Sequence, residues 1–294
     1  MQAPWIGQES YPVWQDLKYA LFFACAYPVL QKLLYVTIFD MAARATVDDG
    51  KKPVNKVAAE RKEVAVRKYK ESAWKLLFYA LAWSYGVYIT YDKEWWITKG
   101  TLNFWKGWPE QKMRMDLKLF YASELGFYSY GIVFLLLWET KRKDFGVMTI
   151  HHIGTLVLIS YSYFTGFVRV GNMVLLAHDI SDILLEGAKL FKYSKNEIGA
   201  SVTFALFAIS WLVFRLIYYP TYLIRSTAFE AQKAFLENRT VAETVVYYYC
   251  FNTFLIMLLV LHVYWFYLIG RMIVKQVQNS GAVGDDVRSD SDDD

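Results

Sequence analysis

Seven ionisable side chains lie inside two hydrophobic segments between residues 141 and 193. Each such group costs roughly 2.5 to 3.5 kcal/mol to place in membrane hydrocarbon, so it usually faces a cavity lined by protein. A neutral imidazole beside a carboxylate is suited to accept a proton near neutral pH. The sequence therefore indicates a polar site inside a membrane protein. Its candidate residues are His151, His152, His178, Asp179, Asp182, Glu186 and Lys189.

The last five of these residues share one side of a predicted helix. At about 100° per residue, four of them fall within an arc of roughly 80°, with Asp179 at its edge. A purely structural interpretation is available for the end of this stripe, because Glu186 and Lys189 are spaced to form an i, i+3 pair. For His178, Asp179 and Asp182, nearer to the middle of the membrane, we favour a functional interpretation.

The histidine doublet begins the preceding hydrophobic segment. His151 and His152 follow closely after Lys143 and Asp144, which predicts a depth of one or two helical turns below the cytosolic surface. Adjacent helical residues diverge by about 100°, so one imidazole can point into a cavity while the other braces it. His262 stands alone in the last hydrophobic segment, and we interpret it as core packing.

Three kinds of chemistry fit this set of residues. Histidines and aspartates can hold a metal ion, but two adjacent histidines do not easily share one ion from a regular helix, and four histidines are too few for a membrane di-iron hydroxylase. We therefore predict no metal. Carboxylates and histidines along helices also build proton or ion pathways. The third interpretation is acid, base and nucleophilic chemistry on a lipid.

The elements that must position these residues are membrane-spanning helices. The chain is 55% hydrophobic and 18% aromatic, which is too apolar for a typical soluble domain. We predict an all-α polytopic membrane protein with about seven transmembrane helices, since seven apolar segments are long enough to cross roughly 30 Å of hydrocarbon. These segments are 18–39, 74–91, 118–138, 146–167, 171–190, 200–224 and 246–270.

The distribution of positive charge predicts the orientation. Lysine and arginine crowd the segments 51–70 and 141–143, which places both in the cytosol, the N-terminus in the lumen and the C-terminus in the cytosol. The N-terminal region has no basic stretch or small-residue cleavage site, so we expect the first segment to be a retained span. Cys25 and Cys250 provide no disulfide framework. No glycine-rich phosphate loop indicates a nucleotide cofactor.

A series of short motifs over more than forty residues resembles the Lag1 motif of ceramide synthases. The surrounding TLC domain would cover about residues 67–277, and flanking residues such as 70–77 resemble the plant members. No homeobox-like insertion, present in many animal members, fits between the first two segments. The motifs are Arg142-Lys143-Asp144-Phe145, His151-His152, Ser160-Tyr161-Ser162-Tyr163, Arg169-Val170-Gly171, His178-Asp179-Ile180-Ser181-Asp182, Leu185-Glu186 and Ala188-Lys189.

The resemblance implies an enzyme of the endoplasmic reticulum membrane, an acyl-CoA-dependent sphingosine N-acyltransferase that forms ceramide. Six helices of the TLC domain would form a barrel around an acyl tunnel, with the first span outside. The family's catalytic residues correspond to His151, His152, Asp179 and Asp182. The amine must lose a proton before it attacks, either directly on the thioester or on an acyl-imidazole, for which we favour His151.

The remaining expectations concern ligands and organisation. We expect fatty acyl-CoA, a sphingoid long-chain base and membrane lipids as partners, a homodimer or heterodimer as an open option, and neither nucleic acid nor a cofactor, because acyl-CoA is a co-substrate. The parts are 1–66, with the lumenal N-terminus, first span and basic linker, the catalytic domain 67–277, and a disordered acidic tail 278–294. Candidate substrate-binding residues are His178, Arg169, Glu186, Lys143 and Lys192.

Two other functions stay open at this point. A non-catalytic TLC-fold protein would bind or translocate lipids as an accessory factor. Some relatives with this fold lack the histidine doublet, which is present in this chain and argues for the enzyme. A transporter would show ion-dependent flux without acyl transfer. The lysines near the cytosolic mouth, Lys143, Lys192 and Lys195, are suited to CoA phosphates but equally to a positive-inside loop.

Overall fold

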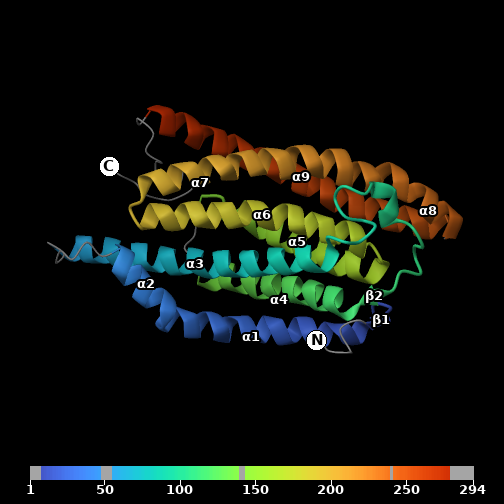
Figure 1. The fold of residues 1–294 in the computed structure, drawn as a ribbon, viewed down its shortest axis with the longest axis horizontal. Coiled ribbons are helices and arrows are strands. Elements are labelled where there is room, and N and C mark those ends of the chain that lie inside the picture. Colours follow the sequence, from blue (N-terminus) through green and yellow to red (C-terminus); the bar gives the residue numbers. More distant parts are fainter. Residues whose placement is uncertain (1–7, 48–54, 139–142, 239–240, 279–294) are drawn as a thin grey trace.

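Long helices run side by side along the longest axis of the molecule (Figure 1). The computed structural model describes residues 8–47, 55–138, 143–238 and 241–278, and the predicted all-α fold is confirmed for this part of the chain. Its α-helices are α1 (Leu17–Val36), α2 (Ile38–Val47), α3 (Lys56–Thr90), α4 (Met115–Leu137), α5 (Phe145–Thr165), α6 (Val168–Tyr193), α7 (Glu197–Ser210), α8 (Ala231–Asn238) and α9 (Val241–Gln278).

Two short strands and the loop between α3 and α4 lie at one end of the bundle. Strand β1 (Glu9–Ser10) pairs antiparallel with β2 (Met113–Arg114). The 3₁₀ helices η1 (Trp14–Asp16) and η2 (Thr101–Phe104) belong to the same region. The α6–α7 turn lies at the opposite end, on the left of Figure 1.

All seven predicted segments are largely helical, although 18–39 crosses the break at Thr37 and 200–224 crosses from α7 into the π-helix that follows it. Five helical stretches are apolar and long enough to cross a membrane. The helices α3 and α6 are as long but more polar, because α3 carries tyrosines and lysines and α6 carries the acidic stripe. A multi-pass membrane protein is therefore supported, while the number of seven spans stays a prediction. The five stretches are Trp14–Val36, Met115–Leu137, Phe145–Thr165, Glu197–Glu237 and Val245–Gln278.

The contacts between successive neighbouring helices form a closed series. Helix α3 packs against α4 and α6, α6 against α7 and the π-helix η3 (Trp211–Ile224), and α9 against η3 and α5, which in turn packs against α4. Helix α1 lies mainly against α4, and α2 packs against α3. The interior thus receives side chains from six successive helical stretches. The barrel implied by the resemblance is taken up below as a proposal.

The stretch between α7 and α8 is π-helical apart from Arg225. The π-helices η3 and η4 (Ser226–Glu230) follow α7 with Pro220 inside the first of them. A π-helix bonds i to i+5 and is frequent at functional sites. Residues Trp211, Arg215 and Tyr219, spaced by four, are all buried toward α6 and α9.

The division of the chain into three parts is not tested by this fold. Helix α3 begins at Lys56, ahead of the predicted domain boundary at residue 67, so the segment predicted as a linker contains helical residues on both sides of 48–54. Residues 48–54 and the predicted tail from 279 onward lie outside the described residues.

Candidate active site

A cavity of about 230 Å³ lies between the helices. It extends toward the end of the bundle that holds the α6–α7 turn, because Lys192 and Tyr193, the last residues of α6, line it. Both histidines of the doublet also line it, together with Asp182 from α6. Three of the four predicted catalytic residues therefore face one space. The cavity also receives side chains from α1, α3, α4, α7, η3 and α9.

The histidine doublet is held by α5 with its two rings nearly perpendicular, 5.7 Å apart. The Nδ1 atom of His152 lies 2.9 Å from the Met148 carbonyl oxygen. Because a carbonyl only accepts, Nδ1 carries the hydrogen, and in the neutral form of the ring Nε2 is the unprotonated nitrogen. A Cβ added to Gly131 would lie 3.8 Å from that Nε2 atom, so glycine on α4 leaves room beside the imidazole.

His151 occupies the boundary between two cavities. A second, narrower space of about 40 Å³ lies beyond it, and His151 and Tyr128 line both. Its Nδ1 atom is buried and has no hydrogen-bond partner among the described residues. The ring packs edge-on against Trp265, 5.2 Å between centroids. The second cavity is mainly apolar and is lined further by Leu158, Ile159, Val174, Leu175, Phe251, Leu255 and Leu258.

Two acidic residues on the polar side of α6 form ion pairs with different partners. Asp182 forms a 2.8 Å ion pair with Arg215 of η3, whose other contacts are the carbonyl of His178 at 2.9 Å and the ring of Trp211 at 4.1 Å. Glu186 pairs with Lys189 at 2.6 Å, as its spacing predicted. The arginine thus fixes the Asp182 carboxylate at the cavity wall.

His178 pairs with His262. Their Nε2 atoms lie 3.0 Å apart, and Nδ1 of His178 lies 2.6 Å from the Val174 carbonyl. The carbonyl again assigns the hydrogen to Nδ1 of His178, so Nε2 of His262 must donate. His262 is fully buried, as the interpretation as core packing expects, but its contact with His178 was not predicted. The cause is long range, since 84 residues separate the pair.

Two carboxylates lie behind the cavity wall. Asp179 and Glu124 of α4 are fully buried, and neither carboxylate has a hydrogen-bond partner among the described residues. Both lie within electrostatic range of Asp182. Within the described ranges, no three histidine, cysteine or acidic side chains are arranged to hold a metal ion.

Comparison with known proteins identifies the fold family. The family described as TRAM_LAG1_CLN8, TLC domain, matches residues 68–271. The chain belongs to the TLC-domain family. "Ceramide synthase LOH2" of Arabidopsis thaliana is 45% identical over 290 residues, which cover 98% of this chain and 96% of that protein.

Other relatives are also named as ceramide synthases. "Ceramide synthase LOH1" of Arabidopsis thaliana is 44% identical over 98% of this chain and 94% of its own length. "Ceramide synthase 4" of Mus musculus is 35% identical over 76% of this chain and 54% of its own length. The resemblance to ceramide synthases is therefore confirmed.

The predicted substrate-binding residues are not all brought to the cavities of this TLC domain. Glu186 and Lys192 line the larger cavity and His178 the smaller one. Lys143 is exposed and lines neither. Arg169 lies at the opposite end of α6, where it donates to the carbonyls of Asn103 and Lys106 and stacks over Trp95.

The site also contains residues that sequence reasoning missed. Arg215 and Glu124 are ionisable residues inside strongly apolar segments, and that feature alone was a signal for a functional position. Gln31 and Tyr35 of α1 line the cavity, although α1 precedes the matched domain. No spacing rule within one helix predicts those contributions, because they depend on how α1 docks.

Proposed function

We propose that this protein is a ceramide synthase, a sphingoid base N-acyltransferase that joins a long-chain base to the acyl group of fatty acyl-CoA. One observation carries the proposal. His151 lies between the larger cavity, which contains Asp182, and the smaller space, which is lined mainly by apolar side chains. An acyl group attached there would have its carbonyl beside Asp182 and the first carbons of its chain directed toward the leucines.

The reaction proceeds in two steps at the doublet. An imidazole nitrogen of His151 attacks the thioester carbonyl carbon, the carbon–sulfur bond breaks, and the CoA thiolate takes a proton. The amine of the base then attacks the same carbon, forming the amide and breaking the bond to imidazole. Overall, one ammonium and one thioester give an amide, a thiol and one released proton. The tautomer of His152, fixed by Met148, leaves its Nε2 atom as a base for the first or second step.

The carboxylates remove the proton of the amine. A sphingoid ammonium is positively charged, and Asp182 at the cavity wall is a negative group that can hold it and accept its proton. Asp179 and Glu124 are buried behind it within electrostatic range, so the protonation states of the three carboxyl groups are linked. Arg215 prevents Asp182 from turning away, because the guanidinium contacts both Asp182 and the backbone of α6.

The acyl-CoA enters from the end that holds the α6–α7 turn. Its acyl chain fits hydrocarbon but its phosphates do not, and Lys68 and Lys192 line that part of the cavity. Lysine ammonium groups there bind phosphate oxygens. We extend the proposal to the fold: seven spans, six of them a barrel around the acyl tunnel, in the endoplasmic reticulum membrane with a cytosolic C-terminus.

The test measures ceramide from purified protein, labelled acyl-CoA and sphinganine, with His151→Ala, His152→Ala, Asp179→Asn and Asp182→Asn. Each variant is expected to lose at least 100-fold in turnover, in line with the contribution of a base or nucleophile. Asp92→Asn, an exposed aspartate paired with Lys93 at the far end, is the matched control. Near-normal turnover in two of the four variants would refute the site.

A second measurement separates the two routes. With acyl-CoA and no base, intact-protein mass spectrometry should find an acyl adduct that disappears in His151→Ala. Ceramide formation without any adduct under single-turnover conditions favours direct attack on the thioester. Lipid binding without acyl transfer would indicate an accessory protein instead.

A further inference from the structure

Helix α1 presents a row of polar and aromatic side chains to the line where α3 and α4 meet. Tyr27, Gln31 and Tyr35 follow at four-residue spacing, so they share one side of the helix. Tyr27 packs edge-on against Phe78 of α3 and against Phe127 of α4. Helix α1 therefore covers the seam between α3 and α4 from outside.

The covered seam is open at the level of Gln31. Gln31 and Tyr35 line the central cavity, together with residues of α3 and α4 on either side. A helix outside the bundle can line an interior cavity only where the two helices beneath it are apart. At this level α1 is the wall of the cavity, whereas at Tyr27 the aromatic side chains of α3 and α4 fill the space.

The wall at this level is polar on its inner side and apolar on its outer side. Gln31 accepts a hydrogen bond from Tyr130 of α4 and donates one to Tyr35 at 2.9 Å. On the outer side, Val29 and Leu33 are 70% and 56% exposed, which suits contact with lipid. The segment 29–36 is therefore a single layer of side chains between the membrane hydrocarbon and the larger cavity.

Regular helical backbone structure is interrupted at both ends of this segment. Pro28 precedes it and removes one helical hydrogen bond. Thr37 follows it with φ −111° and ψ −94°, where α1 breaks before α2 begins. Bends in helices arise at such positions.

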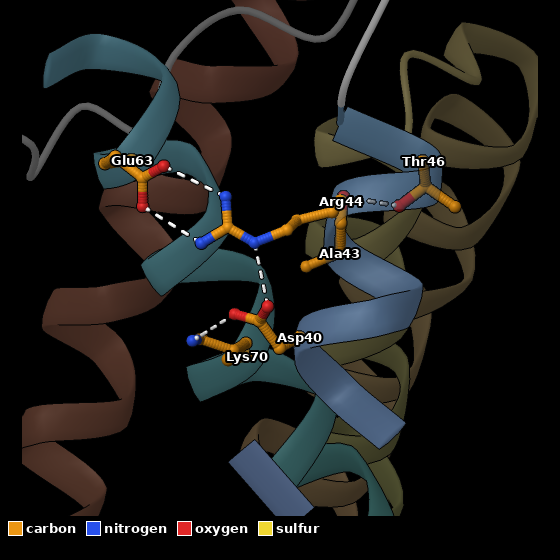
Figure 2. Close-up of polar contacts among 6 residues, drawn as sticks. All are labelled: Asp40, Ala43, Arg44, Thr46, Glu63 and Lys70. Carbon is orange, nitrogen blue, oxygen red and sulfur yellow. Dashed lines mark hydrogen bonds and ion pairs between the residues drawn. The ribbon is translucent and has the colours of Figure 1, made fainter. Parts of the chain in front are cut away.

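The residues on either side of this segment are held to neighbouring helices by polar contacts. On one side, Tyr27 and Ser123 share a 2.5 Å hydrogen bond. On the other, α2 is bound to α3 through ion pairs of Arg44 with Glu63 and of Asp40 with Lys70 (Figure 2). Between these flanking residues, the segment 29–36 is bounded by Pro28 and Thr37 and is held to α4 through the Gln31–Tyr130 hydrogen bond, which must break for the segment to move.

We infer that residues 29–36 of α1 cover a lateral portal between α3 and α4. Through this portal a single-chain lipid amine enters the larger cavity from the membrane. This inference rests on the proposed function. A long-chain base lies in the bilayer with its amine and hydroxyls near the interface, so a side opening lets the chain stay in hydrocarbon. Gln31, Tyr35 and Tyr130 provide donors and acceptors for its hydroxyl groups as it passes.

The experiment joins the segment 29–36 to α4 with a reducible cross-link, so that the segment cannot move away from the portal. In a background with Cys25→Ser and Cys250→Ser, Gln31→Cys and Tyr130→Cys are joined by a short bis-methanethiosulfonate. The matched control joins Arg44→Cys to Glu63→Cys, two exposed positions in the contact between α2 and α3. The readouts are photolabelling by a photoreactive sphingosine, photolabelling by a photoreactive acyl-CoA, and ceramide formation.

The expected result is selective. Locking 31 to 130 should reduce sphingosine labelling and ceramide formation at least tenfold, spare labelling by acyl-CoA, and be reversed by dithiothreitol, while locking 44 to 63 changes none of these. Unchanged sphingosine labelling in the locked protein would overturn the portal. An unlocked protein that binds both lipids but makes no ceramide would refute the proposed function and leave the portal standing.

A single substitution provides a second test that needs no cross-link. Gln31→Leu removes the polar contacts and should raise the KM for sphinganine at least fivefold while the KM for acyl-CoA stays within twofold. Leu33→Ala, on the lipid side of the same segment, is the control. Equal changes of both KM values in Gln31→Leu would count against the inference.

Discussion

Arg215 and Asp182 form an ion pair whose side chains are only 4% and 18% exposed. Removing one partner of a buried pair costs about 3 to 5 kcal/mol, because the other charge stays buried without compensation. Replacing both by neutral groups of similar size is often close to neutral. The pair therefore allows stability and catalysis to be separated by mutation.

We predict that Arg215→Met lowers the thermal stability of the detergent-solubilised protein and abolishes ceramide formation. Adding Asp182→Asn in the same chain should restore most of the melting temperature, because no unpaired charge remains, but not the activity, because the base is missing. Melting followed by size-exclusion chromatography measures the first effect and ceramide formation the second. If the double variant is as unstable as the single one, the ion pair is not what Arg215 contributes.

At the scale of elements, Gly126 sets how closely α1 approaches α4. A Cβ at this position would lie 2.6 Å from the Cβ of Phe23 and 2.9 Å from the backbone oxygen of Ala20. Backbone cannot move aside locally, so Gly126→Ala should push α1 outward and destabilise the protein by about 1 to 3 kcal/mol, as overpacking does.

A matched glycine provides the control for this prediction. Gly270 of α9 has no atom within 4 Å of an added Cβ. Alanine is favoured over glycine in a helix by up to about 1 kcal/mol, so Gly270→Ala should leave the melting temperature unchanged or raise it. A melting temperature for Gly126→Ala equal to that of the wild type would mean that α1 is not held by this contact.

The contact between α2 and α3 should depend on pH through Asp40. Hydrogen bonds from Lys70 and Arg44 hold the pKa of Asp40 below its usual value. A carboxylate with a lowered pKa contributes stability above its unfolded pKa of about 3.9 and loses it as the pH falls through the folded pKa. The attachment of α2 should therefore be constant from pH 8 to 5 and weaken below about pH 4.

Spin labels on Met41 and Glu60, both exposed, measure this attachment as a distance distribution. The distribution should broaden only at the acidic end, and Asp40→Asn should show the broad form at every pH. The pair is partly exposed, so the effect on global stability stays within about 1 kcal/mol. A distribution that does not respond to acid or to Asp40→Asn would remove Asp40 from the attachment.

The sequence predicted single-helix features better than contacts between helices. The polar stripe and the Glu186–Lys189 pair follow from the 3.6-residue period, so they were predictable. Arg169 could have been excluded by the same rule, since it precedes His178 by about 14 Å of helical rise. The partner of His262 and the cavity-lining role of Gln31 depend on helix docking, which no local pattern encodes.

At the scale of the whole molecule, the helices place the segment between α3 and α4 at one end of the bundle and the α6–α7 turn at the other (Figure 1). By the positive-inside rule, the basic residues from 51 to 70 predict that the second end is cytosolic. The proposed acyl-CoA opening requires this orientation, because the lysines of the cavity must face the compartment that contains acyl-CoA.

Cysteine labelling tests that orientation. In a cysteine-free background in sealed microsomes, Glu60→Cys on α3 and Glu197→Cys on α7 should react with an impermeant maleimide added outside, since both positions are exposed at the cytosolic end. Thr98→Cys, exposed in the loop after α3, should react only after detergent is added. The reverse pattern would place the lysines of the cavity in the lumen, and acyl-CoA would then have no charged site at its opening. Labelling of Glu60→Cys and Glu197→Cys on different sides would instead show that α3 to α6 do not each cross the membrane, which would contradict the seven-span proposal.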